Sequence, residues 1–229
     1  MSRLIGILGG SFNPPHFGHL RPAREAMAWL GLEKMVFLPS GEHPLKKNGD
    51  LALASHRLAM IKAAVADEPR FEVSDLDVRH PGISYTVETL ERLAPIYPDR
   101  ELVFLVGADI LRELPFWKDW RGIFERAHLA VMARPGTDLN FSNPDLTGPL
   151  DRQVADFLLT IQVDCPEQLN RSSSGAYGFI RLPITPLDIS STQIRTLIKN
   201  GEGSARLMPA GVRDYINRNR LYLSESKHG

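Results

Sequence analysis

Short apolar runs that alternate with amphipathic stretches constrain the fold of this chain more than any other feature. Near-continuous hydrophobicity is what a strand needs when helices cover both faces of its sheet. The runs that meet this need are Leu4–Leu8, Met35–Pro39, Leu102–Val106 and Leu129–Ala133. A fifth run, Phe71–Val78, alternates apolar and polar positions and is expected nearer a sheet edge.

Amphipathic stretches of helical length lie between these runs. They predict helices over His19–Gly31, Leu51–Asp67, Tyr85–Tyr97 and Trp117–Ala127. Strands and helices that alternate at this spacing indicate repeated βαβ units. The expected fold class is therefore α/β, with a doubly wound parallel sheet.

The second half of the chain is expected to add a connection and a helical end. Turn-forming residues make 134–150 a long surface connection, and residues 151–160 form a helix before a possible strand at 179–185. Two further helices are predicted within 190–201 and 209–222. With no repeat or strong boundary in view, residues 1–229 are interpreted as one domain, in which 186–229 is a small C-terminal helical part.

Composition excludes several function classes. Lys+Arg and Asp+Glu number 27 each, so no global field attracts nucleic acid or an anionic membrane. The single cysteine, Cys165, excludes an internal disulfide and suits a reducing cytosol. The N-terminus does not resemble a signal peptide, and no apolar stretch approaches the roughly 20 residues that span a bilayer. We expect a cytoplasmic protein.

The stretch GGSFNPPHFGHL, Gly9–Leu20, leaves the first predicted strand and enters the first helix. Gly9 and Gly10 let the backbone turn tightly and approach a ligand. A helix that begins near Gly18 offers N–H groups and a positive dipole end to an anion, and His16 and His19 flank that start. A purely structural turn and a two-histidine metal site are the competing interpretations, although no third metal ligand is evident.

The stretch resembles the nucleotidyltransferase signature G-[ST]-F-[DN]-P-x-H-x-G-H, in whose superfamily the two histidines contact nucleotide phosphates. Asn13 stands where many members have aspartate. The superfamily also has a second phosphate motif, which ISSTQIR, Ile189–Arg195, resembles. A serine here can cap the following helix, Thr192 adds a hydroxyl, and Arg195 can reach phosphate bidentately. Alone, this pattern also fits a capped surface helix.

Several further stretches resemble one family, the nicotinate-nucleotide adenylyltransferases. They are LPSGEHPLKK, ISYTVETL, LVGAD, PFWKDW, ARPG and LMPAGVRDYINRNRLY. The resemblance implies a Rossmann-like enzyme that transfers AMP from ATP to nicotinate mononucleotide with Mg²⁺. Residues 140–181 carry no matching motif.

The resemblance also implies a set of site residues. His16, His19 and Arg195 would be catalytic. ATP would be bound by Gly9, Gly10, Ser11, Phe12, His16, His19, Gly107, Asp109, Arg134, Ser191, Thr192 and Arg195. The pyridine mononucleotide would be bound by Lys46, Tyr85, Thr86 and Trp117. No protein metal ligand is implied. Each residue also has an ordinary structural interpretation, such as a core tryptophan at Trp117.

Rival functions remain at this point. Another small adenylyltransferase, such as one that acts on phosphopantetheine, shares the histidine motif but not the SYT and tryptophan elements. A non-catalytic nucleotide sensor would not need both phosphate-binding motifs intact. A hydride-transferring dehydrogenase would need the dinucleotide fingerprint G-x-G-x-x-G, which the chain lacks. A class I aminoacyl-tRNA synthetase would carry a lysine-rich loop and a tRNA-binding domain.

Overall fold

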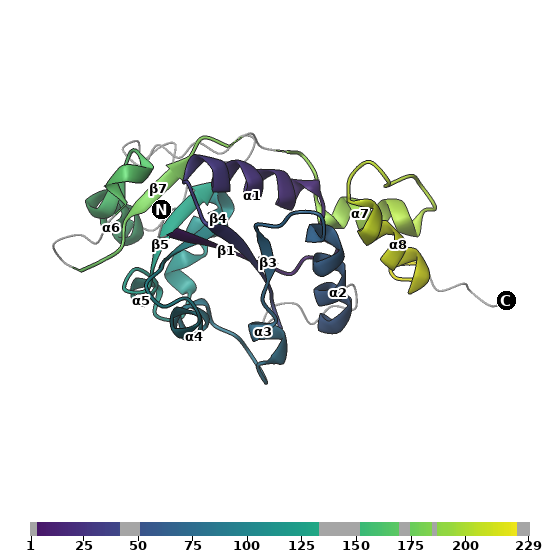
Figure 1. Ribbon diagram of the computed structural model, residues 1–229, viewed down its shortest axis with the longest axis horizontal. Helices are drawn as coiled ribbons and strands as arrows, with labels where there is room; N and C mark the ends of the chain where they lie inside the picture. Colours follow the sequence, from purple (N-terminus) through teal and green to yellow (C-terminus); the bar gives the residue numbers. More distant parts are fainter. Residues whose placement is uncertain (1–3, 42–50, 133–151, 170–174, 185–186, 224–229) are drawn as a thin grey trace.

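The computed structural model describes residues 4–41, 51–132, 152–169, 175–184 and 187–223. Its centre is a seven-stranded sheet in the order β3-β2-β1-β4-β5-β7-β6, and every neighbouring pair is parallel (Figure 1). The strands are β1 (Leu4–Gly10), β2 (Lys34–Pro39), β3 (Phe71–Val73), β4 (Glu101–Gly107), β5 (Ala127–Met132), β6 (Gln162–Val163) and β7 (Phe179–Leu182). The expected α/β class with a parallel sheet is confirmed.

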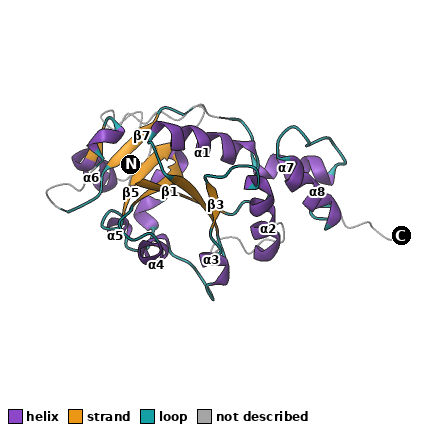
Figure 2. Ribbon diagram, in the orientation of Figure 1, coloured by secondary structure: helices purple, strands orange, loops and turns teal. Residues whose placement is uncertain are grey.

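Helices cover both faces of the sheet, as Figure 2 shows. The α-helices are α1 (Phe17–Trp29), α2 (Ala54–Val65), α3 (Leu76–Arg79), α4 (Thr86–Leu93), α5 (Trp120–Ile123), α6 (Arg152–Ile161), α7 (Ser191–Lys199) and α8 (Ala210–Arg218). Short 3₁₀ helices lie at η1 (Ala94–Ile96), η2 (Ala108–Arg112), η3 (Leu114–Phe116) and η4 (Pro166–Gln168). Helices α1 and α2 pack on one face, and α4, α5 and α6 on the other. The sheet is doubly wound.

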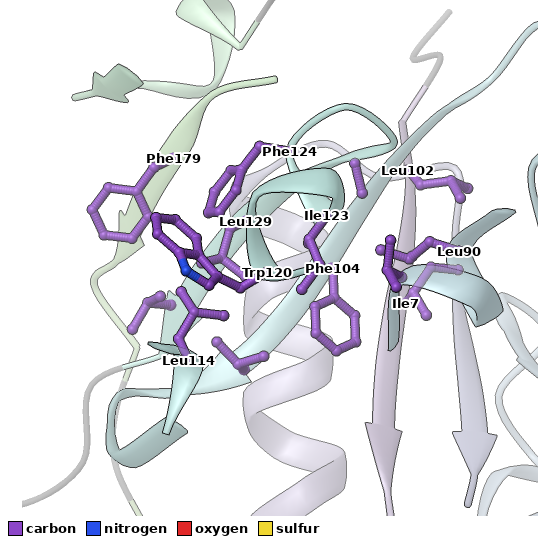
Figure 3. Close-up of a cluster of buried hydrophobic side chains, with 14 of the residues drawn as sticks. Ile7, Leu90, Leu102, Phe104, Leu114, Trp120, Ile123, Phe124, Leu129 and Phe179 are labelled. Atoms are coloured by element: carbon purple, nitrogen blue, oxygen red, sulfur yellow. The ribbon is translucent and has the colours of Figure 1, made fainter. Parts of the chain in front are cut away.

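Alternation along β1 divides the core into two layers. Ile5 and Ile7 point into the layer under α4 to α6, whereas Leu8 points into the layer under α1 and α2. Figure 3 shows the first layer, in which Ile7 and Phe104 lie with Trp120 and other side chains of the helical face. Each fully buried side chain of this kind contributes about 1.5–3 kcal/mol relative to exposure.

The order of the strands places a switch point beside β1. The chain moves from β1 to β2 and β3 on one side, and then returns to β4 on the other side. In open parallel sheets, ligands bind outside the carboxyl ends of the strands at such a point. The loop after Gly10 and the loop after Gly107 meet there, since β1 and β4 are neighbours in register.

Three predicted elements differ from the structure. The strand expected over 71–78 ends at Val73 as an edge strand, and α3 follows because Ser74 Oγ accepts a hydrogen bond from the Leu76 N–H at 3.3 Å. The helix expected over 117–127 shortens to α5, which Asp119 begins in the left-handed region with φ of 45°. The helix expected over 85–97 ends at Leu93 and continues as η1.

The C-terminal helices extend the α2 side of the molecule (Figure 1). A separate apolar cluster joins them to α2: Met60, Ile194, Met208, Val212 and Ile216 are all buried there. Helix α7 ends before Gly201, whose φ of 72° suits a glycine after a helix. The strand expected within 179–185 is confirmed as β7, and both C-terminal helices are confirmed as α7 and α8. The connection expected over 134–150 lies outside the described residues.

Candidate active site

The loop after β1 is held in a defined shape by its own side chains. Phe12 adopts a positive φ of 46°, and the Asn13–Pro14 peptide bond is cis. The Phe12 ring is only 1% exposed and lies edge-on to Phe37, with ring centroids 5.9 Å apart, and to His19, at 5.2 Å. Phe12 thus anchors the loop through its ring, and only its backbone remains to face a ligand.

The two histidines lie together at the start of α1. His16 is the N-cap residue and is 4% exposed, and its ring centroid lies 3.8 Å from that of His19. The His16 backbone N–H donates to His19 Nδ1 at 3.3 Å. A neutral His19 that accepts at Nδ1 carries its proton on Nε2, which makes that nitrogen a donor. The pair therefore offers oriented imidazoles at a helix start whose Phe17 N–H already donates to the Leu207 carbonyl and whose His19 N–H donates to the His16 carbonyl, each at 2.9 Å.

Gly18 lies between the histidines because a side chain would not fit. A Cβ atom at this position would lie 2.9 Å from the His16 ring and 3.0 Å from the carbonyl oxygen of Ile189. The second contact is informative, since Ile189 begins the ISSTQIR stretch. The two motifs are thus packed directly against one another across the chain.

Hydrogen bonds fix the second motif to the loop after β1. Ser190 caps α7 by accepting from the Gln193 N–H at 3.1 Å. Ser191 Oγ donates to the Pro14 carbonyl at 2.9 Å, and Arg195 Nη1 donates to the Asn13 carbonyl at 2.9 Å. Arg195 Nη2 lies 3.3 Å from Thr192 Oγ1. Two helix N-termini, those of α1 and α7, therefore converge on one loop.

Aromatic residues form the side of the site toward α4. Tyr85 precedes α4 and is partly exposed, and Lys118 Nζ lies 4.6 Å from its ring centroid while pairing with Glu88. That hydrogen bond from Lys118 lowers the pKa of Glu88. Trp117 lies 6.3 Å from Phe104 between ring centroids. Phe104 in turn lies beside Gly9, where a Cβ would be 3.6 Å from its ring.

Of the remaining predicted site residues, the structure describes some and leaves others outside its described ranges. Gly107 ends β4, and the exposed Asp109 lies in the first turn of η2, so both are at the carboxyl edge beside β1. Lys46 and Arg134 lie outside the described residues. The structure brings the loop after β1, the histidines and the second motif together. It places Tyr85 just before α4, Thr86 at the first residue of α4, and Trp117 beside Phe104.

Two buried charged residues near the site were missed from the sequence. Arg57 is 1% exposed, and burial lowers its pKa. Asp77 is 6% exposed, and burial raises its pKa despite hydrogen bonds from Thr89 and a charge at Arg92. A signal for Arg57 was present: it shares the apolar face of α2 with Met60, Ile61 and Val65, where a solvated arginine does not belong.

No helix of the described residues is long and apolar enough to cross a bilayer. Within the same residues, no group of three or more His, Cys, Asp or Glu side chains could hold a metal ion.

Comparison with known proteins agrees with this geometry. The cytidylyltransferase-like family model matches residues 7–197. A "Probable nicotinate-nucleotide adenylyltransferase" of Syntrophotalea carbinolica is 40% identical over 228 residues, covering 97% of this chain and 99% of that protein. A protein of the same name from Dechloromonas aromatica is 39% identical over 226 residues, covering 97% and 99%.

Solved structures share the fold. Nicotinic acid mononucleotide adenylyltransferase of Plasmodium falciparum, complexed with APC, superposes with a TM-score of 0.65 at 16% identity and covers 96% of this chain and 97% of its own. A putative nicotinate-nucleotide adenylyltransferase of Vibrio parahaemolyticus gives 0.62 at 17% identity, covering 98% of each chain. The family model and the sequence relatives together decide the family. This chain belongs to the nicotinate-nucleotide adenylyltransferase family, within the cytidylyltransferase-like proteins.

Proposed function

We propose that this protein transfers AMP from ATP to nicotinate mononucleotide, giving nicotinate adenine dinucleotide and pyrophosphate, a step of NAD biosynthesis. Membership of the family supports the reaction. The single observation that carries it in this chain is the union of the two motifs, in which Arg195 and Ser191 bond to the loop that leads to His16. The two motifs that would bind the phosphates are thus joined in one place.

The chemistry asks mainly for alignment and charge stabilisation. A phosphate oxygen of the mononucleotide attacks the α-phosphorus of ATP. The new P–O bond forms as the bond from that phosphorus to the bridging oxygen breaks, and pyrophosphate leaves with the electron pair. The nucleophile is already anionic at pH 7, so no general base is needed. Groups that donate to the developing charge and fix the geometry are sufficient.

Each end of the site has a proposed part in this step. His16 and His19, at the positive N-terminal end of the α1 dipole, would bind the α-phosphate and stabilise its charge. Arg195 and the N-terminus of α7, with Ser191 and Thr192, would hold the β- and γ-phosphates. The other proposed contacts to ATP come from Gly9, Gly10, Ser11, Phe12, Gly107, Asp109 and Arg134.

Magnesium is proposed to enter with ATP as part of the substrate. Mg²⁺ usually keeps several waters and binds substrate phosphates with one or two carboxylates at most. The described site fits that mode, since its side chains are mainly donors for phosphate oxygens rather than a cage of carboxylates. The triphosphate would therefore hold the ion, whose positive charge would offset the negative charge of the phosphates.

The mononucleotide is proposed to bind toward α4. Thr86 begins that helix and Tyr85 precedes it, so first-turn N–H groups are available for the carboxylate of the pyridine ring. Trp117 would cover the ring, and Lys46 is the proposed cation for the nucleotide phosphate. An amide offers one acceptor oxygen and would set its NH₂ against a donor. The acid should therefore be the better substrate.

The proposal extends to the organisation of the chain. Residues 1–229 would act as one nucleotidyltransferase domain in the cytoplasm, with 186–229 closing the phosphate end of the site. A chromatographic assay with ATP, Mg²⁺ and nicotinate mononucleotide should give the dinucleotide and pyrophosphate in equal amounts. Phosphopantetheine as acceptor should give no product. Binding of ATP without turnover of either acceptor would favour a nucleotide sensor instead.

A further inference from the structure

Arg57 is a buried cation, and within the part of the chain that the structure describes its hydrogen bonds reach uncharged oxygens. Its Nη1 donates to the Ser11 carbonyl at 2.9 Å and to Ser40 Oγ at 3.3 Å. Its Nη2 donates to the Gly41 carbonyl at 2.9 Å, and its Nε to the Ala52 carbonyl at 3.0 Å. Buried arginines are usually paired with acids, so this arrangement needs its own explanation.

The acceptors of Arg57 come from three separate segments. Ser11 lies in the loop after β1, Ser40 and Gly41 follow β2, and Ala52 precedes α2. A guanidinium is a planar fork with five N–H donors, so it can hold several carbonyls in a fixed relation. Lysine offers a point charge, and glutamine has too few donors. The geometry therefore depends on arginine.

The segment after β2 continues this network toward α4. A Cβ atom at Gly41 would lie 2.2 Å from the carbonyl oxygen of Asp77, so the two backbones are in close contact. The Asp77 carboxylate accepts from Thr89 Oγ1 at 2.8 Å and from Arg92 Nη2 at 3.1 Å. Both partners lie on α4. Contacts therefore run without a gap from Ser11, through Arg57 and Gly41, to α4.

We propose that Arg57 is a positioning residue that sets the distance between the loop after β1 and α4. The inference rests on the proposed function, in which these two elements hold ATP and the mononucleotide respectively. In-line transfer depends on their separation, and a displacement of about 1 Å can cost on the order of a hundredfold in rate. Loss of Arg57 should lower kcat more than it changes the KM of either substrate.

The test compares Arg57→Lys and Arg57→Gln with Ile61→Ala. Ile61 is buried on the same helix but contacts the apolar layer under α1 and α2. Its truncation should therefore lower the stability of the protein, as the loss of Arg57 does, without removing a contact to the loops that Arg57 joins. Assayed well below each melting temperature, both Arg57 variants should lose about a hundredfold in kcat, while each KM stays within about threefold. The kcat of Ile61→Ala should be unchanged. Equal kcat in all variants overturns the proposal. So does a loss of kcat that is proportional to the fall in melting temperature across the three variants.

A second readout does not depend on activity. In hydrogen exchange, Arg57→Lys should increase exchange in peptides that cover 9–13 and 86–93 together, with no change over α8. Ile61→Ala should not reproduce that pair of changes. Unchanged exchange in both segments overturns the positioning role even if the wild type proves inactive. Inactivity of the wild type with both pyridine mononucleotides counts instead against the proposed function.

Discussion

The Tyr222 hydroxyl donates a hydrogen bond to Asn13 Oδ1 at 2.7 Å, which joins the end of the described chain to the loop after β1. The same oxygen accepts from the Ala52 N–H at 3.1 Å. In both bonds the side-chain oxygen of Asn13 is the acceptor. Burial raises the pKa of Tyr222, so the phenol remains protonated and able to donate at neutral pH.

Removal of this hydroxyl should loosen the loop. Tyr222→Phe is expected to lower the free energy of unfolding by about 1 kcal/mol. If that restraint is felt when ATP binds, the KM for ATP should rise about fivefold. The matched control is Tyr215→Phe, which loses a hydroxyl bond to His56 Nδ1, 3.0 Å long, in the same helical part. An equal rise in both variants would show that the contact to Asn13 has no special effect.

His19 should matter for turnover far more than for stability. By analogy with loss of one preorganised donor, His19→Ala should lower kcat by about 10²–10³. Loss of the acceptor for the His16 N–H should cost only about 1 kcal/mol in denaturant unfolding. His56→Ala, which removes a histidine bonded to Tyr215, should keep full activity. Full activity of His19→Ala would remove the catalytic assignment.

Arg195 should discriminate between nucleotides by the length of their phosphate chains. A hydrogen bond to a charged group is worth about 1.5–3 kcal/mol, so Arg195→Ala should weaken ATP binding by about 10- to 150-fold in titration calorimetry. The affinity for AMP, which lacks the β- and γ-phosphates, should change little. Lys199→Ala removes an exposed cation from the end of the same helix and should leave both affinities unchanged. Equal weakening of ATP and AMP would contradict this placement.

Asp77 should make stability depend on pH. Burial raises the pKa of Asp77 in the folded state above its ordinary value of 3.8, so the native state holds this proton more tightly than the unfolded chain. Its contribution to stability is complete below pH 3.8 and is lost as pH rises through the raised pKa. Relative to wild type, Asp77→Asn should therefore gain stability from pH 4 upward until the group has ionised.

The control for this prediction is Asp75→Asn, whose side chain is 31% exposed against 9% for Asp77. Urea unfolding of both variants between pH 4 and pH 8 gives the comparison with wild type. A stability difference between wild type and Asp77→Asn that does not change with pH would be inconsistent with the raised pKa.

Strands β1, β2, β4 and β5 were predictable because most of their residues are buried and the runs are therefore nearly uniform in hydrophobicity. Residues 71–78 misled because Asp75 and Asp77 mimic the alternation of a strand. Asp77 is instead buried on α3 by side chains of α4, a tertiary contact that local pattern does not encode. Similarly, the helix expected from Trp117 was shortened by the left-handed turn at Asp119.

The motifs around His16 and Arg195 were visible because they resemble the two signature motifs of the nucleotidyltransferases. The sequence also led us to expect that they act together, but it did not show the contact of Gly18 with Ile189. Arg57 and Tyr222 were missed since they act through backbone oxygens and an asparagine far along the chain. Such partners become evident only in three dimensions.

Preference for the acid over the amide tests the central claim most directly. The measurement is kcat/KM for nicotinate mononucleotide and for its amide counterpart, with ATP and Mg²⁺ held constant. One charge-assisted bond at the α4 N-terminus is worth about 1.5–3 kcal/mol, which predicts at least about a tenfold preference for the acid. Equal use of the two mononucleotides, or absence of dinucleotide product from either, would contradict the account.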